Sequence, residues 1–209
     1  MRKTKFTNTI DSISISGQCT AILLFIFLFG ISTGVFFEVM MGTEMKSSMQ
    51  SYLQNILQAP MSSDSTAIHS FISLLGSIIS NSLAILLIAF AGFTRFAYPV
   101  SSVVILVKGM SLGYCCALML ETLAFKGVFV IALALFPQNT LLIPAIILTA
   151  NAAISKSQST HYKRNKGMIR SGFNSADVPY LYMSIFFCFL AVLGCIIQSF
   201  FLPIAARML

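Results

Sequence analysis

The chain has 209 residues, of which 57% are hydrophobic and 9% are charged, whereas about 25% of the residues in an ordinary soluble domain are charged. A soluble fold of this length would have to bury long apolar stretches with too little polar surface to cover them. The composition therefore excludes an ordinary soluble domain and predicts an all-α, polytopic membrane protein. The net charge of +7 then reflects membrane topology, so we expect membrane lipid around the chain and no nucleic-acid partner.

Five stretches are long enough to cross a bilayer, which requires about 20 apolar residues in a helix. Four of them are apolar almost throughout, and the remaining one, residues 124–154, is longer and contains prolines. The four are residues 19–37, 68–93, 96–120 and 178–203. We predict one five-helix transmembrane domain over residues 19–203, with an N-terminal segment 1–18 and a C-terminal tail 204–209.

The first stretch follows a basic segment, as the apolar part of a signal peptide does. Its apolar run is longer than that of a typical signal peptide, it ends in Phe36 and Phe37, and no small-residue cleavage pattern follows closely. We therefore expect it to be an uncleaved first helix.

The basic residues predict the orientation, because Lys and Arg accumulate in cytoplasmic loops. With the N-terminus in the cytoplasm, nine of the 13 basic residues fall on the cytoplasmic side, three outside and one, Lys108, within a span. The cytoplasmic ones are Arg2, Lys3, Lys5, Arg95, Lys156, Lys163, Arg164, Lys166 and Arg170. This arrangement predicts an extracytoplasmic C-terminus.

The extracytoplasmic loop 38–67 contains an apolar stripe at helical spacing. The stripe predicts an amphipathic helix that ends before Pro60. The helix either lies on the membrane surface or binds an extracytoplasmic partner. The stripe consists of Met45, Met49, Tyr52, Leu53, Ile56 and Leu57.

The cytoplasmic loop 156–177 has five basic residues before residue 171 and no acid among them. Cations at this position interact with anionic lipid headgroups. The loop therefore serves as a topological anchor or binds a cytoplasmic partner.

All five cysteines fall within the apolar stretches, without the spacing of a metal site or a disulfide framework. We predict that they are small packing residues and expect no metal and no cofactor. They are Cys19, Cys115, Cys116, Cys188 and Cys195.

Lys108 is the most informative single residue, because a lysine near the centre of a span costs at least about 2.5 kcal/mol on insertion. Its structural interpretation is pairing with Gln138, Asn139 or backbone carbonyls, or extension toward the membrane surface. Its functional interpretation is a conformational or partner-contact site. Gly109 and Gly113 follow it in a Gly-xxx-Gly pattern that permits close helix packing, and Gly30 and Gly34 form the same pattern in the first span.

The fourth stretch contains Pro137, Gln138, Asn139 and Pro144. Each proline removes a backbone donor and clashes with the preceding turn, so we predict a helix that is kinked or broken between Pro137 and Pro144. A re-entrant hairpin is the alternative, but it would place the basic loop outside the cytoplasm.

Catalytic patterns are weak in this sequence. Ser111 lies in a Gly-x-Ser-x-Gly string, but it lacks the strand and turn of a nucleophile elbow, and no histidine falls within a span to serve as its base. We predict that the protein is not an enzyme.

Several motifs together resemble the bacterial stage II sporulation protein M family. They are Lys108-Gly109, Gly113-Tyr114, Pro137-Gln138-Asn139, Ile143-Pro144-Ala145 and the N-terminal Met1-Arg2-Lys3-Thr4. The resemblance covers the whole layout of five spans.

The resemblance implies a non-enzymatic membrane scaffold in endospore formation, located in the septal or engulfing membrane of the mother cell. It also implies two partners, the stage II sporulation proteins D and P, which remodel peptidoglycan during engulfment. The alternative is a permease or an exporter membrane subunit with an intramembrane lysine site at Lys108. The oligomeric state stays open, and a homo-oligomer is compatible with the sequence.

Overall fold

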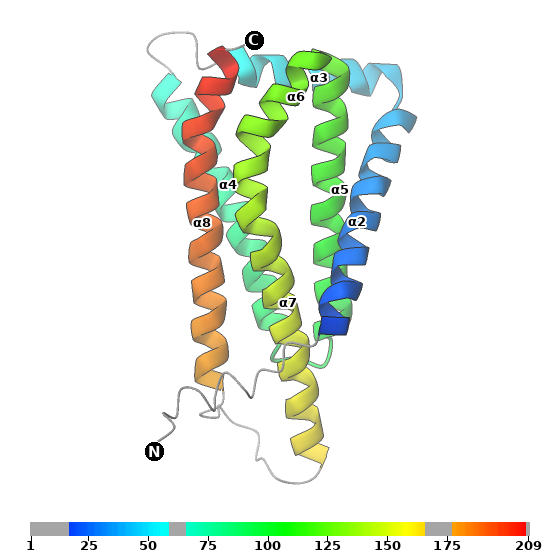
Figure 1. The fold of residues 1–209 in the computed structure, drawn as a ribbon, viewed down its shortest axis with the longest axis vertical. Helices are drawn as coiled ribbons and strands as arrows, with labels where there is room; N and C mark the ends of the chain where they lie inside the picture. Colours follow the sequence, from blue (N-terminus) through cyan, green and yellow to red (C-terminus); the bar gives the residue numbers. More distant parts are fainter. Residues whose placement is uncertain (1–16, 59–65, 166–176, 208–209) are drawn as a thin grey trace.

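The fold is a bundle of helices that run alternately up and down (Figure 1). The computed structural model describes residues 17–58, 66–165 and 177–207, and within these ranges five helices are long and apolar enough to cross a membrane. The elements are α2 (Gly17–Met40), α3 (Thr43–Gln58), α4 (Thr66–Ala91), α5 (Ala97–Leu123), α6 (Phe125–Val130), a π-helical segment η2 (Ile131–Leu135), α7 (Phe136–Asn165) and α8 (Asp177–Arg207). The prediction of an all-α membrane bundle is confirmed.

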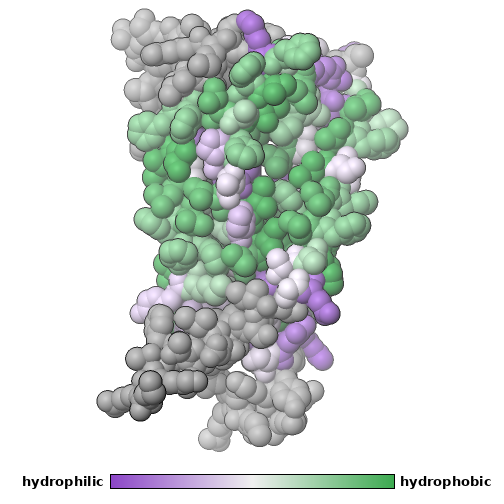
Figure 2. Space-filling view, in the orientation of Figure 1, coloured by the Kyte–Doolittle hydropathy of each residue, from purple (hydrophilic) through white to green (hydrophobic). Residues whose placement is uncertain are grey.

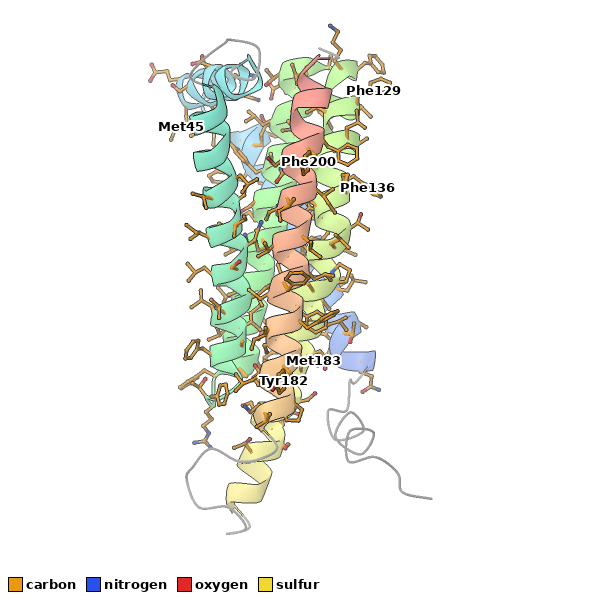
Figure 3. All side chains as sticks on the ribbon, turned by 90° about the vertical axis from the view of Figure 1, so that its left-hand side faces the viewer. Met45, Phe129, Phe136, Tyr182, Met183 and Phe200 are labelled. Carbon is orange, nitrogen blue, oxygen red and sulfur yellow. The ribbon has the colours of Figure 1, made fainter. Side chains whose placement is uncertain are left out.

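The two ends of the bundle differ. At one end, called the α3 end below, α3 lies across the ends of the upright helices, whereas α7 projects beyond its neighbours at the opposite end, the α7 end (Figure 1). Between the ends the surface is largely apolar (Figure 2). Phe136 and Phe200 are 68% and 70% exposed and point away from the bundle (Figure 3). Side chains of this kind are covered by lipid.

The helix α7 is the centre of the bundle. Of its most apolar window, 61% of the residues are buried, against 22% to 33% in the other four spans. It contacts α2, α4, α5 and α8. This position explains why α7 tolerates polar residues, because its neighbours shield Gln138, Thr149 and Asn151 from the hydrocarbon.

The two Gly-xxx-Gly patterns pack against each other and join α2 to α5. A Cβ atom on Gly30 would lie 2.6 Å from the carbonyl oxygen of Leu106, and one on Gly109 would lie 2.5 Å from that of Phe27. Cβ atoms on Gly34 and Gly113 would overlap backbone atoms of the facing helix. The missing side chains are therefore what allows the two backbones to approach this closely.

The fourth predicted stretch runs in one direction from α6 through η2 into α7 (Figure 1), so it is not a hairpin. Its irregularity lies one turn before the predicted position. The π-helical turn Ile131–Leu135 precedes Pro137, and α7 continues through Pro144 without a break. A π turn widens the helix just where the proline ring would meet the preceding carbonyl, which explains its location.

A single residue, Ala124, joins α5 to α6. Its φ of 49° is unusual for a residue with a side chain and marks a strained reversal between the two helices.

Several helices extend further than the sequence predicts, among them α8, which ends at Arg207 rather than at residue 203. α2 includes Glu38 and ends at Met40, and α7 continues eleven residues past Ile154 to Asn165. Much of the predicted basic loop is therefore helical. The predicted N-terminal segment before Gly17, the residues 166–176 and Pro60 lie outside the described residues, as do the side chains of Tyr52, Leu53, Ile56 and Leu57.

Replacing Gly34 with alanine is expected to destabilise the protein by about 1 to 3 kcal/mol, because the new methyl group overlaps the backbone of Met110. The matched control is Gly76→Ala in α4, where a Cβ meets no atom within 4 Å. Thermal unfolding in detergent micelles should show a lower midpoint for the first variant alone. Equal midpoints for the two variants would contradict the close packing of α2 on α5.

Candidate functional site

Lys108 lies near the middle of α5, is half-buried and forms hydrogen bonds with α4. Its Nζ donates hydrogen bonds to Asn81 Oδ1 at 2.7 Å and to Ser80 Oγ at 3.5 Å. The predicted pairing with Gln138, Asn139 or backbone carbonyls is therefore wrong. The partner comes from an apolar stretch of α4 in which Asn81 is the only amide, and an amide within a span was the signal that could have identified it.

The hydrogen bonds continue from Asn81 across the bundle. Asn81 Nδ2 donates to Cys195 Sγ at 3.3 Å, and Gln138 Nε2 donates to the same sulfur at 3.4 Å. The three residues are 7%, 2% and 7% exposed. Lys108, Asn81, Cys195 and Gln138, called the polar chain below, thus connect α5, α4, α8 and α7. Cys195 is more than a packing residue, because it accepts two hydrogen bonds from buried amides.

A small cavity lies beside the polar chain. Its volume is about 30 Å³, and Lys108 and Asn139 contribute its polar groups. The remaining lining is apolar and consists of Phe27, Ile105, Leu142, Ile143, Ile146 and Ile147. A site of this size holds one or two water molecules, whereas pockets for small-molecule ligands occupy about 300 Å³ or more.

The predicted residue Asn139 and its neighbour Thr140 form hydrogen bonds within α7 itself. Asn139 Nδ2 donates to the carbonyl of Leu135 at 2.8 Å, and Thr140 Oγ1 donates to that of Phe136 at 2.8 Å. Both carbonyls belong to the turn around Pro137, so these side chains supplement its backbone hydrogen bonds. Among the predicted intramembrane residues, Lys108 and Gln138 belong to the polar chain, while Gly109 and Gly113 pack on α2.

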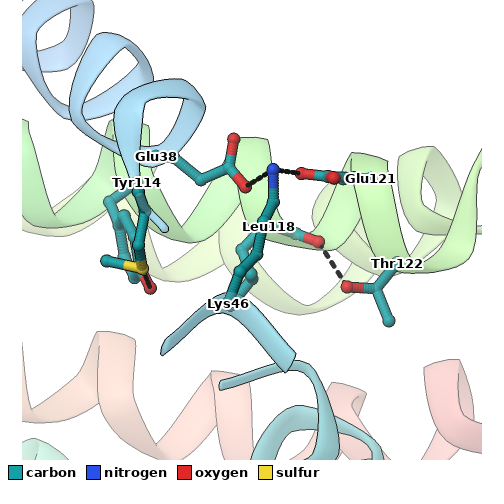
Figure 4. Close-up of polar contacts among 7 residues, drawn as sticks. Glu38, Lys46, Tyr114, Leu118, Glu121 and Thr122 are labelled. Carbon is teal, nitrogen blue, oxygen red and sulfur yellow. Dashed lines mark hydrogen bonds and ion pairs between the residues drawn. The ribbon is translucent and has the colours of Figure 1, made fainter. Parts of the chain in front are cut away.

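A second polar cluster lies at the α3 end, where Lys46 of α3 sits between two carboxylates (Figure 4). Its Nζ is 3.1 Å from Glu38 Oε1 of α2 and pairs more closely with Glu121 Oε2 of α5. Glu38 is only 3% exposed, so its charge depends on this cation. The hydrogen bond from Lys46 to Glu121, and then that to Glu38, raise the pKa of Lys46 above its ordinary value. These three residues, called the ion-pair cluster below, fix α3 to α2 and α5.

A third cluster lies at the α7 end. Lys156 Nζ lies 3.2 Å from the ring centroid of Phe93 and 4.2 Å from that of Tyr180. The Tyr180 hydroxyl donates to the carbonyl of Ala89 at 2.8 Å, and Ser157 Oγ donates to that of Thr94 at 2.7 Å. The sequence places Lys156 in a basic loop, but the structure places it on α7, where cation–π contacts join α7, α8 and the turn after α4.

The predicted surface stripe lies on α3. Met45 and Met49 are 59% and 39% exposed, in agreement with a helix that presents apolar side chains away from the bundle. Whether they contact lipid or a partner stays a prediction. Within the ranges that the structure describes, no group of three or more His, Cys, Asp and Glu side chains could hold a metal ion.

The fold and the polar chain define a polytopic membrane protein whose intramembrane lysine is hydrogen-bonded inside a helical bundle. The family model of stage II sporulation protein M matches residues 23–203, so the chain belongs to that family and is a sporulation-related membrane protein. The resemblance seen in the sequence motifs is thereby confirmed. A search of curated proteins found no match, and neither did a search of solved structures.

Replacing Asn81 with leucine is expected to cost about 1 to 3 kcal/mol, because the half-buried ammonium group of Lys108 loses its closest acceptor. Asn139→Leu is the control, since the Asn139 amide donates to a carbonyl of its own helix, and its cost should be smaller. In a double-mutant cycle with Lys108→Met, thermal unfolding in micelles should give a coupling energy of about 0.6 kcal/mol or more. Additive effects of Asn81→Leu and Lys108→Met would argue against the bond.

Replacing Lys46 with glutamine is expected to loosen α3, because the Glu38 and Glu121 carboxylates then face each other without a cation. Amide hydrogen exchange in α3 should become faster, whereas Glu44→Gln, which changes a charge in the first turn of the same helix outside the ion-pair cluster, should have a smaller effect. The raised pKa of Lys46 also sets a pH dependence. The attachment is complete at neutral pH and is lost as the pH rises through the raised pKa. Unchanged exchange in Lys46→Gln would refute this role.

Proposed function

We propose that this protein is a non-enzymatic scaffold in endospore formation. It recruits or anchors the peptidoglycan-remodelling stage II sporulation proteins D and P at the septum, where the mother-cell membrane begins to engulf the forespore. In this proposal the partners cleave the cell wall, and the five-helix bundle holds them in place.

The observation that carries the proposal is the family match over residues 23–203, together with the way the bundle is packed. Its intramembrane charge is bound by side chains of a neighbouring helix, and three clusters at different depths tie the helices together. Such a bundle is a rigid support, which suits a scaffold.

The permease alternative requires a water-accessible cavity at the depth of Lys108. The cavity beside Lys108 and Asn139 lies at this depth, but its volume of about 30 Å³ is too small for a solute larger than water. Packing of this kind favours the scaffold.

The proposed orientation has a cytoplasmic N-terminus and an extracytoplasmic C-terminus. It is supported by Arg95 and Lys156, which lie at the α7 end, opposite to α3. Since basic residues favour the cytoplasmic side, α3 then faces the compartment that contains peptidoglycan.

Deleting the gene in its host should block engulfment, and fluorescent fusions of proteins D and P should spread over the mother-cell membrane. Complementation with the wild-type chain is the positive control, and the Glu44→Gln chain should complement equally well. Normal engulfment with both fusions at the septum of the deletion strain would refute the proposal.

A further inference from the structure

The face of α4 around Gly76 has no other part of the protein packed against the glycine. A Cβ atom on Gly76 would meet nothing within 4 Å, in contrast to those on Gly30, Gly34, Gly109 and Gly113. Ser80 follows one turn later and is exposed. α4 and α5 are joined by a short turn at the α7 end and diverge toward the α3 end (Figure 1).

The open face is next to the intramembrane cation. Ser80 Oγ is the second acceptor of Lys108, at 3.5 Å, so the ammonium group lies at the edge of this surface. An ammonium group has three donors, and the partners described above are an amide and a hydroxyl, both neutral. Within the residues that the structure describes, Lys108 forms no ion pair with a carboxylate.

We infer that the face formed by Gly76, Ser80 and Lys108 binds one membrane-spanning helix of another protein, and that this helix carries an Asp or Glu at mid-membrane depth. The absent side chain at Gly76 admits a second helix at close range, as the paired glycines of α2 and α5 do. The carboxylate completes the coordination of Lys108, since intramembrane charges are stabilised by opposite charges. The inference rests on the proposed scaffold role and gives that scaffold a contact surface.

A second copy of this chain does not fit the same description. Of its six acidic residues, those within described helices lie near helix ends, and Glu121, the acid of the same helix, is thirteen residues from Lys108. That separation is about 20 Å along the helix axis. The described helices of a second copy in the same orientation therefore offer no carboxylate at the depth of Lys108.

The test places a photoreactive amino acid at Leu83, which is 53% exposed and lies seven residues from Gly76 on the same face of α4. The control position is Phe25 of α2, which is 71% exposed. The full-length chain is expressed in its sporulating host and irradiated, and the cross-linked segment is identified by mass spectrometry. We expect the Leu83 position to capture a membrane span of another protein with Asp or Glu near its centre, and the Phe25 position to capture lipid.

Two variants test the two parts of the surface. Lys108→Gln should lower the adduct yield about tenfold, which corresponds to an intramembrane polar pair of about 1.4 kcal/mol. Gly76→Leu should lower the adduct yield similarly. The new side chain projects into open space, so this variant leaves the fold intact. Replacing the captured Asp or Glu with its amide should lower the yield with wild-type Lys108 but have no further effect with Lys108→Gln.

Four results would overturn the inference: capture of lipid only, capture of a second copy of this chain, capture of a span without a carboxyl group, or adduct yields that neither variant changes. The result is separable from the scaffold proposal. If deletion of the gene releases proteins D and P but the two variants keep them at the septum, the surface is wrong and the scaffold stands. If the deletion leaves both proteins in place, the scaffold itself fails.

Discussion

The hydrogen bond between Lys108 and Asn81 is the interaction on which the interior of the bundle depends. An intramembrane ammonium group needs a good acceptor, and here that acceptor joins α5 to α4. The Asn81 amide that accepts the hydrogen bond from Lys108 also donates one to Cys195 of α8. Gln138 of α7 donates to the same sulfur, so the hydrogen bonds extend to α7 as well. A series of hydrogen bonds thus links one charged residue to four helices.

Small residues play a complementary part. In lipid, helices gain little from hiding apolar surface, so close backbone contact must supply the packing energy. The paired glycines of α2 and α5 use this effect inside the bundle, whereas Gly76 presents the same opportunity on the outside. A glycine face that is covered by another helix of the bundle contributes to internal packing, whereas an uncovered one is a surface available to a helix of another protein.

The sequence alone predicts the five spans and the helix on the surface, because a period of apolar residues and the thickness of the bilayer determine both. It also identifies Lys108 as exceptional. It does not predict Asn81 as the partner, since the choice between Asn81, Gln138 and Asn139 depends on how α4 and α7 are rotated about their axes. Similarly, the prolines indicate an irregular helix, but local packing decides which turn becomes irregular. The π-helical segment η2 lies before Pro137 rather than after it. The ion-pair cluster joins residues far apart in the chain and has no local signal.

The length of α7 has a consequence for the α7 end of the molecule. At 30 residues the helix is about 45 Å long, whereas the hydrocarbon core is about 30 Å thick. Its last turns therefore lie outside the hydrocarbon core. At the start of these turns Lys156 contacts two aromatic rings. A basic segment built on such a helix has already lost its backbone entropy before anything binds to it. Binding of an acidic surface or headgroup at this end of the protein therefore costs less conformational entropy than binding to a flexible loop of the same charge would.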